Sequence, residues 1–492
     1  MNRLLDPLMG RLLSAAGDVA LSSWATYRSL FAPILTGPVR EQLSRRRAAA
    51  AFFHARRTVP AYREFLAGHG LMDVRHFADV PPMDKDSYIK KWPLESLCQN
   101  GRIPDHGVVI DESSGSSGTA TNWVRGPAER AIARRLIQYS ARATFGNDTF
   151  VLLNAFALGP WATGMNVSMS MVDRCILKSI GPDAGKVAAT LALLGPRYRY
   201  LIAGYPPFLK SLVETASIDW KDFNICAIVG GEGMSEALRS VLNNHFRKTI
   251  SSFGASDLEI NIAVETDYTI ALRQRLSADP ALSVALCGSE RLPMIFQYDP
   301  LNYLVESDSE RNLLVTINRL ETVSPRVRYN IRDRGIVRST QAVDDVLETQ
   351  GRPSHARAPR LDLPLLFHWG RQDSSVAFYG CKITPEDIQH VVLRIAALGQ
   401  TIANFALHPW EDEGANKRLE LWLESAPGAP TPDNAAAIDD AVWRELATVN
   451  QDFRESIKMV PPNRRPTVKL FTFGESPISG QDVRIKKQYI VY

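Results

Sequence analysis

The sequence predicts an α/β protein with a large N-terminal domain of several layers and a small α+β C-terminal domain. The chain has 492 residues, of which 45% are hydrophobic and 22% charged, and this is enough for two or three domains with large cores. Between about residues 107 and 340, short β-rich runs alternate with helical stretches, which is typical of sheets covered by helices. A polar stretch at 339–360 then separates this region from a tail with helices and strands of its own.

The first hundred residues are predicted to be mostly helical. Leucines recur at helical spacing in residues 1–21, and acidic and basic residues interrupt them, so we expect a helix packed on the protein rather than a signal peptide. Helix formers fill residues 39–70, where Pro60 breaks the helix and Gly68 and Gly70 end it. We therefore treat 1–106 as a helical lead-in.

The middle of the chain carries the predicted layers. Strands are expected at 107–111, 150–156, 225–231 and 312–318, and helices at 128–144 and 235–248. No repeat with a period of 20–50 residues is present, which excludes a solenoid.

Residues 339–360 are rich in Pro, Arg and Asp, and we predict a long surface loop there. We place the domain boundary at Arg371–Asp373, so the predicted domains are 1–372 and 373–492. In the tail, helices are expected at 385–398 and 434–457 and strands at 418–425 and 467–473.

Charge and cysteine content exclude several classes of protein. The formal net charge is +4, from 57 basic and 53 acidic residues, so there is no charge pattern for nucleic-acid binding. The five cysteines are far apart and include no CxxC pair, which favours a reducing cytoplasm over a disulfide framework or a zinc site. No apolar run reaches the roughly 18 residues needed to span a bilayer, so no membrane partner is expected.

A Ser/Gly-rich stretch, SSGSSGTAT at 113–121, directly follows the apolar run at 107–111. Glycines allow backbone N–H groups to approach a phosphate closely and hydroxyls add donors, but a Ser/Gly stretch is also a common turn. No Lys follows Gly118, which excludes the P-loop of the kinase type. On these residues alone, a turn and a phosphate-binding loop both stay open.

Four further segments, together with this loop, resemble the acyl-adenylating superfamily and, within it, the phenylacetate–CoA ligase branch. The segments are SSGSSGTAT (113–121), GGEGMSEALR (230–239), SFGASDLE (252–259), PRVRYNIRDRG (325–335) and GRQDSSVAFYGCKITPEDIQ (370–389). They occur in the order in which that family has them. The resemblance runs from about residue 50 to the C-terminus, and the segment around Gly370 is the most specific part of it.

The resemblance implies a large adenylate-forming N-terminal domain and a small mobile C-terminal domain. It also implies ATP-dependent formation of an acyl-adenylate from a carboxylic acid, with an aryl or other small organic acid as substrate, and transfer of the acyl group to coenzyme A. Two alternatives stay open: transfer to an amine or a hydroxyl, and a nucleotide-binding protein without catalysis. ATP, Mg²⁺ and coenzyme A are the implied cofactors, and the oligomeric state is left open.

The resemblance also assigns residues to roles. The implied ATP-binding residues are Ser113, Ser114, Gly115, Ser116, Ser117, Gly118, Thr119, Gly231, Glu232, Phe253, Gly254, Ala255, Ser256, Asp333 and Arg371. Asp257 would bind the metal, with Glu259 in reserve, and Lys486 or Lys487 would be the mobile catalytic cation. Asp373 is the implied hinge and Gly380 and Lys382 would line the acceptor path, whereas the expected substrate residues are Phe156, Gly159, Trp161, Gly164 and Tyr205.

Each of these roles has a structural alternative. Asp333 has Arg332 and Arg334 beside it and would form an ion pair with one of them, Gly380 fits a hairpin turn, and the aromatic stretch at 154–165 fits core packing. The chain departs from the family pattern with Ala120 in place of Pro, Asp257 in place of Glu and Arg332 in place of Gly, and its last lysines lie in DVRIKKQYIVY rather than in a Gly-Lys context. The altered Pro, Glu and Gly-Lys positions are the reason for the third, non-catalytic alternative.

Overall fold

The computed structural model describes most of the chain. The described residues are 19, 21–31, 37–74, 76–113, 121–159, 162–352, 361–371, 375–395, 398, 401–429, 435–479 and 489–491, without the side chains of Ser113 and Glu386. The chain forms two compact units. The first takes its described residues from Met1–Ser113, Asn122–Ser179 and Ile250–Gly370, and the second from Ser114–Thr121, Ile180–Thr249 and Arg371–Tyr492.

The centre of the first unit is a run of seven neighbouring strands. Their order is β10-β11-β12-β13-β9-β8-β7. The strands are β7 (Lys248–Phe253), β8 (Ala263–Val264), β9 (Met294–Tyr298), β10 (Tyr303–Ser307), β11 (Asn312–Ile317), β12 (Tyr329–Arg338) and β13 (Leu365–Arg371). The pairs β7–β8, β8–β9, β9–β13, β10–β11 and β11–β12 are all antiparallel.

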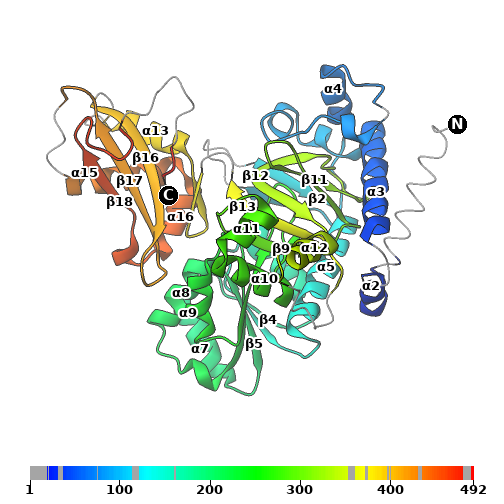
Figure 1. The fold of residues 1–492 in the computed structure, drawn as a ribbon, viewed down its shortest axis with the longest axis horizontal. Helices are drawn as coiled ribbons and strands as arrows, with labels where there is room; N and C mark the ends of the chain where they lie inside the picture. Colours follow the sequence, from blue (N-terminus) through cyan, green and yellow to red (C-terminus); the bar gives the residue numbers. More distant parts are fainter. Residues whose placement is uncertain are drawn as a thin grey trace. The chain divides into compact units, whose positions relative to one another are not determined.

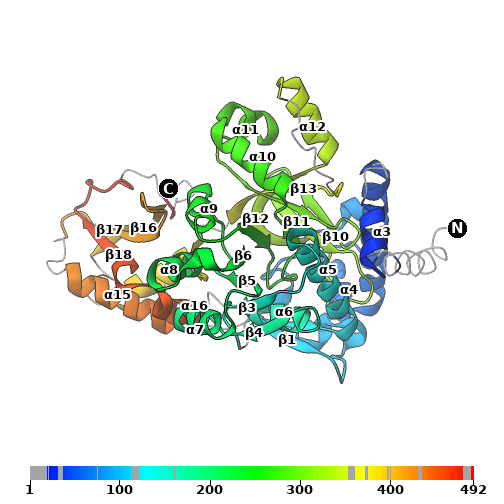
Figure 2. The same ribbon diagram turned by 90° about the horizontal axis from the view of Figure 1, so that it is seen from below.

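The strands β9 and β13 are buried on both faces, because consecutive side chains along a strand point to opposite sides. Phe296 and Leu366 belong to the core shared with the N-terminal helices. Ile295, Leu365 and Phe367 belong to a second core on the other face. Three helices form that second core with them: α10 (Asp267–Ala278), α11 (Pro280–Cys287) and α12 (Thr340–Thr349), which lie together in Figure 2.

The lead-in covers the opposite face of these strands. Its helices are α2 (Trp24–Leu30), α3 (Gly37–Thr58) and α4 (Pro60–Gly68), followed by four short 3₁₀ turns at Phe77–Asp79, Ile89–Lys91, Glu95–Leu97 and Gln99–Gly101. The helix α3 lies along β10 and β11 (Figure 1). Pro60 starts a new helix because a proline lacks the N–H that continuation of α3 would need.

The Ser/Gly stretch connects two paired strands of the first unit. These are β1 (Val109–Ser113) and β2 (Thr121–Arg125), which are followed by α5 (Pro127–Phe145). Next come β3 (Val151–Asn154), α6 (Ala162–Met171) and β4 (Ile176–Ser179), and β3 and β4 pair in parallel. The helices α5 and α6 pack against each other, and α6 also contacts β1.

The second unit contains a parallel pair of strands, β5 (Arg199–Gly204) and β6 (Asn224–Val229). Three helices accompany them: α7 (Ala184–Leu194), α8 (Pro206–Thr215) and α9 (Glu236–Asn243). A 3₁₀ turn at Trp220–Asp222 precedes β6. The helix α8 contacts both α7 and α9.

The C-terminal part of the second unit has a core of its own. A three-stranded sheet is built from β16 (Ile402–Glu411), β17 (Lys417–Ser425) and β18 (Thr467–Phe471), with β16–β17 antiparallel and β17–β18 parallel. The hairpin β14 (Val376–Phe378)–β15 (Cys381–Ile383) and the helices α13 (Pro385–Arg394), α15 (Ala435–Val449) and α16 (Gln451–Ser456) pack with it, and 3₁₀ turns follow at Ile457–Met459 and Pro462–Arg464. The predicted boundary between 372 and 373 stays a prediction.

The fold confirms the predicted α/β class, but one element was assigned wrongly. The polar stretch that begins at Ser339 forms α12 rather than a loop from its start. Ser339 caps this helix by accepting a hydrogen bond from the N–H of Ala342, and Val343 and Leu347 are buried one turn apart. Thr340 is buried as well, whereas Gln341, Asp345, Glu348 and Thr349 are exposed, and this exposed face explains the polar composition.

A substitution at Gly126, at the start of α5, tests how tightly the first unit is packed there. A Cβ atom at Gly126 would overlap the Cγ2 methyl of Val323. We expect Gly126→Ala to lower the free energy of unfolding by about 1–3 kcal/mol, because overpacking forces neighbouring atoms to move. Urea denaturation measures this change. Gly68→Ala is the control, since nothing lies within 4 Å of its added Cβ, and Val323→Ala should restore part of the loss in a double variant. A loss of the same size in both single variants would contradict the steric explanation.

Candidate functional site

The turn after β7 holds five of the predicted site residues of the first unit. An added Cβ at Gly254 would lie 2.7 Å from the backbone N of Asn261 and 2.8 Å from the carbonyl oxygen of Glu259. The N–H of Ala255 donates to the same carbonyl at 3.0 Å. Glycine is therefore required at 254, because the chain folds back on itself and leaves no room for a side chain.

Phe253 and Asp333 lie on either side of a histidine that the sequence analysis did not select. The ring centroids of Phe253 and His368 are 4.7 Å apart. On its other side, Nε2 of His368 is 3.0 Å from Oδ2 of Asp333, and both side chains are largely buried. Arg332 has a positive φ of 60° and pairs with Asp84 and Asp86. The ion pair between Arg332 and Asp333, which was one alternative, is not formed.

Asp257 lies in a partly exposed position among cationic and hydroxyl groups. The hydroxyl of Tyr329 donates to its Oδ2 at 2.8 Å, and Nζ of Lys85 is 3.6 Å from its Oδ1. The backbone carbonyl of Asp257 accepts a hydrogen bond from Nε of Arg326 at 3.0 Å. Lys85 also lies over the ring of Trp123, 5.5 Å from the centroid. The Asp257 carboxylate is therefore oriented by its neighbours.

Glu259 has a different environment. Its carboxylate is buried and pairs with Arg319 through Oε1, and Oε2 accepts a hydrogen bond from the hydroxyl of Tyr303. Both oxygens are thus engaged by protein groups, which does not fit a ligand that exchanges water or phosphate at a metal ion. Among the described residues, no group of three or more His, Cys, Asp and Glu side chains is arranged to hold a metal.

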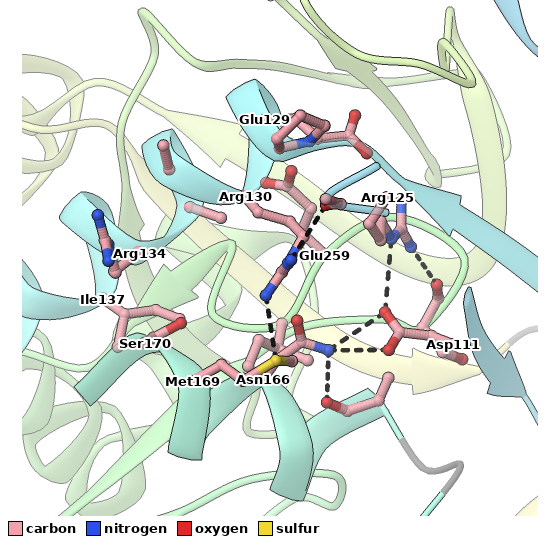
Figure 3. Close-up of a pocket in the computed structure, with 17 residues that line it drawn as sticks. Asp111, Arg125, Glu129, Arg130, Arg134, Ile137, Asn166, Met169, Ser170 and Glu259 are labelled. Carbon is pink, nitrogen blue, oxygen red and sulfur yellow. Dashed lines mark hydrogen bonds and ion pairs between the residues drawn. The ribbon is translucent and has the colours of Figure 1, made fainter. Parts of the chain in front are cut away.

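A pocket of about 230 Å³ opens between α5, α6 and the turn after β7 (Figure 3). Its lining residues are Gly107, Asp111, Arg125, Pro127, Glu129, Arg130, Ala131, Ala133, Arg134, Ile137, Ala162, Asn166, Met169, Ser170, Ser256, Glu259 and Ile260. Ser256 and Glu259 belong to the turn that carries the predicted ATP-binding residues. The pocket therefore adjoins that turn.

Near β1, the pocket wall contains Asp111, whose negative charge is balanced by Arg125 and whose oxygens accept from Asn166. Nε of Arg125 is 3.7 Å from Oδ2 of Asp111, and its Nη2 donates to the carbonyl of Ser256 at 2.6 Å. Nδ2 of Asn166 lies 3.1 Å from each oxygen of Asp111. Burial raises the pKa of Asp111, although Arg125 and Asn166 act in the opposite direction. These contacts fix β1 against α6 and β2.

Three of the predicted substrate residues, Phe156, Gly159 and Gly164, lie close to this wall in sequence but are not among the residues that line the pocket. Asn154 holds the stretch in place: its Oδ1 accepts from the N–H of Phe156 at 3.3 Å, and its Nδ2 donates to the carbonyl of Gly164 at 2.7 Å. Gly159 has a positive φ of 89°. On α6, the residues that line the pocket are Ala162, Asn166, Met169 and Ser170.

In the second unit, the predicted residues Gly231, Glu232 and Gly380 come together near the predicted Tyr205. An added Cβ would lie 2.8 Å from the Tyr205 ring at Gly231 and 3.1 Å from it at Gly380, so both glycines are required by close contact with the ring. The N–H of Gly380 donates to Glu232, whose side chain is fully buried and also pairs with Lys417. Gly380 is part of the turn between β14 and β15 and has a φ of 87°.

The remaining predicted residues are placed as follows. Arg371 ends β13, and Lys382 is exposed on β15, where its carbonyl accepts from Nδ2 of Asn450 at 2.8 Å. Ser113 ends β1. Outside the described residues lie Ser114, Gly115, Ser116, Ser117, Gly118, Thr119, Trp161, Asp373, Lys486 and Lys487.

Sequence reasoning missed His368, Lys417 and Arg130. His368 lies two residues before Gly370 in the most specific motif, so its position was a usable signal. Lys417 carries no such signal, because its partner Glu232 is distant in the sequence. Arg130 carries none either, because it is one of several arginines on an amphipathic helix.

Comparisons with solved structures identify the fold. No protein-family model and no curated protein matches the sequence. The chain is similar to 2-hydroxyisobutyryl-CoA ligase bound to 2-HIB-AMP and CoA in the thioesterification state, with a TM-score of 0.63, 14% identity, and coverage of 93% of this chain and 90% of that chain. The chain thus has the adenylate-forming fold.

Two other structures of the same ligase give a consistent result. The postadenylation state with 2-HIB-AMP has a TM-score of 0.53, 14% identity, and coverage of 93% and 90%. An open conformation with 2-HIB-AMP and CoA has a TM-score of 0.52, 13% identity, and coverage of 92% and 91%. The phenylacetate–CoA ligase branch stays a prediction. No helix in the described ranges is long and apolar enough to cross a bilayer.

Glu129, at the start of α5, makes the free energy of unfolding depend on pH. Its oxygens accept from the N–H of Gly126 at 2.7 Å and of Val323 at 3.1 Å, and burial raises its pKa to about 7. Between about pH 4.5 and 7 the folded state therefore holds a proton that the unfolded state has released, and the stability gained from it is lost as the pH rises through this window.

We expect the free energy of unfolding of the wild type, relative to Glu129→Gln, to fall by about 3 kcal/mol from pH 4.5 to 7. Denaturant titrations across this range measure the difference, and Glu348→Gln on the exposed face of α12 is the control. A difference that stays constant with pH would show that the pKa of Glu129 is not raised.

Proposed function

We propose that this protein is an ATP-dependent, AMP-forming ligase that activates a small carboxylic acid and transfers the acyl group to coenzyme A. In the first step a carboxylate oxygen attacks the α-phosphorus of ATP, the bond to the bridging oxygen breaks and pyrophosphate leaves. In the second step the thiol sulfur attacks the acyl carbon, AMP leaves, and the thiol proton is released. The fold supports this proposal, since the similar ligase is described with an acyl-AMP and CoA.

The observation that carries the proposal is the Phe253–His368–Asp333 arrangement. A carboxylate has two acceptor oxygens at a separation that suits the two hydroxyls of a ribose. The contact with His368 holds the Asp333 carboxylate in one orientation, and the ring of Phe253 lies beside the same histidine. We propose that Asp333 binds the ribose and that the Gly254–Ser256 turn follows the nucleotide, with catalysis by positioning and charge stabilisation.

For the second step, we propose that the Gly380 turn and Tyr205 line the path of the thiol. An added Cβ at Gly231 or Gly380 would meet the Tyr205 ring, so a larger side chain at either position would displace this tyrosine. Lys486 or Lys487 as the mobile cation and Asp373 as the hinge stay part of the proposal. An amine or hydroxyl acceptor is the alternative for this step, and the same adenylate would serve it.

Magnesium would enter with ATP as part of the substrate. Asp257 is the proposed ligand, because its carboxylate is partly exposed and oriented by Tyr329. For Glu259 we propose a structural role in place of the reserve metal role, since Arg319 and Tyr303 engage both of its oxygens. We also propose a cytoplasmic location, which agrees with the five unpaired cysteines.

Carboxylate-dependent exchange of pyrophosphate into ATP tests the proposed function. We expect the purified protein to catalyse this exchange with at least one acid in a panel of aryl, alkyl and dicarboxylic acids, and to form an acyl-CoA when coenzyme A is added. Exchange without thioester formation, but with consumption of a supplied amine or alcohol, would replace the acceptor. A folded protein that binds ATP but shows no exchange with any acid would support the nucleotide-binding alternative instead.

Asp333→Ala tests the ribose contact separately. Loss of charge-assisted hydrogen bonds should weaken ATP binding by about 2–4 kcal/mol, because the Asp333 carboxylate would be the acceptor for both hydroxyls. Calorimetry gives the dissociation constant, and the thermal midpoint shows that the variant is folded. The exposed Asp345→Ala on α12 is the control. An ATP affinity equal to that of the wild type would remove Asp333 from the nucleotide site.

A further inference from the structure

The pocket between α5 and α6 contains a cation whose acceptors are all neutral. Arg130 is half-buried, and its guanidinium donates to the carbonyl of Gly107 at 3.2 Å and to the sulfur of Met169 at 3.0 Å. Figure 3 shows this side chain extended along the pocket from α5 towards α6. A guanidinium has five N–H donors and a thioether is a weak acceptor, so Arg130 has donors left for a ligand.

The other charged groups of the pocket are balanced within the protein. Asp111 pairs with Arg125, and Glu259 pairs with Arg319. Arg134 is 3.8 Å from Asp173 at the exposed rim. Glu129 accepts two backbone N–H groups, and burial raises its pKa to about 7, which reduces its negative charge near neutral pH. Among the described residues, no carboxylate lies within ion-pair distance of Arg130, although Asp111, the partner of Arg125, interacts with its charge over a longer distance.

We propose that Arg130 binds a second, distal carboxylate of the acid substrate, so that the enzyme acts on short dicarboxylic acids. A guanidinium matches a carboxylate through two parallel hydrogen bonds. The volume of about 230 Å³ is below the roughly 300 Å³ at which pockets for drug-sized ligands begin, and this favours a short acid. The lining also includes Ser256, which is one of the proposed nucleotide residues, so an acid held by Arg130 would have its other carboxylate in a pocket that adjoins the proposed site of adenylation.

The assignment of a dicarboxylic acid as substrate rests on the proposed function. It differs from the aryl acid, which is one of the substrates that the sequence resemblance implies. The test compares matched pairs of acids with the same number of carbons: glutarate with valerate, and likewise malonate to adipate with propionate to hexanoate. Pyrophosphate exchange is measured for the wild type, Arg130→Met and Arg130→Lys. Arg135→Met is the control, because Arg135 is exposed on the same helix and does not line the pocket.

We expect at least one dicarboxylate to have a kcat/KM about 10- to 100-fold above that of its matched monoacid, which is the effect of one charge-assisted hydrogen-bond pair. Arg130→Met should abolish this preference and retain exchange with the monoacid, which also shows that the variant is folded. Arg130→Lys should keep part of the preference, and Arg135→Met should keep all of it. Equal use of every matched pair by the wild type would overturn the inference and leave the proposed function standing.

Calorimetry without ATP separates the remaining cases. Binding of the preferred dicarboxylate, weakened at least tenfold in Arg130→Met, supports the inference independently of turnover. If inorganic phosphate binds as tightly as any dicarboxylate and loses the same affinity in Arg130→Met, the site takes a free anion and the substrate assignment is wrong. If dicarboxylates bind at Arg130 but no acid supports exchange, the proposed function fails and Arg130 marks an anion-binding site without a substrate role.

Discussion

The buried ion pair between Glu259 and Arg319 is the interaction on which the first unit's site depends. The Arg319 side chain is fully buried and Glu259 is nearly so, and removing one partner from such a pair typically costs 3–5 kcal/mol because the other charge stays buried. The carbonyl of Glu259 also accepts the N–H of Ala255 and leaves no room for a side chain at Gly254. One residue therefore anchors the turn after β7 through its side chain and shapes the turn through its backbone.

The same pair sets the electrostatics of the neighbouring pocket. Glu259 pairs with Arg319, and Asp111 pairs with Arg125. The negative charges of these two pocket residues are therefore balanced within the protein. In a low-dielectric environment an unbalanced charge is expensive, so a guanidinium that has only neutral acceptors is informative about what binds there. This reasoning could not be made from the sequence, in which Asp257 and Glu259 are two positions apart and both were candidates for a metal.

The sequence predicted the parts of the fold that local patterns control. The break at Pro60 and the strand before the Ser/Gly stretch follow from short-range geometry. The glycines at 231, 254 and 380 followed from the family resemblance, and the contact of two of them with Tyr205 is visible only in the folded chain. The helix α12 was predicted as a loop because its exposed face is polar, and its buried side has few apolar residues, among them Val343 and Leu347. The partners of the site residues were beyond prediction, since contacts such as Asp333 with His368 join residues on different strands.

The second unit shows how two required glycines and a buried acid are linked. Tyr205 packs on Gly231 and Gly380, and Glu232 binds the N–H of Gly380 while Lys417 neutralises its charge. A movement of the β14–β15 turn away from this position would separate Gly380 from Glu232 and leave the acid with Lys417 alone. Because Lys417 begins β17, it would have to move with the same sheet or release the acid to water. The Gly-Glu segment at 230–239 is thus coupled to the turn by a charge as well as by packing, so one substitution at Lys417 would affect both segments at once.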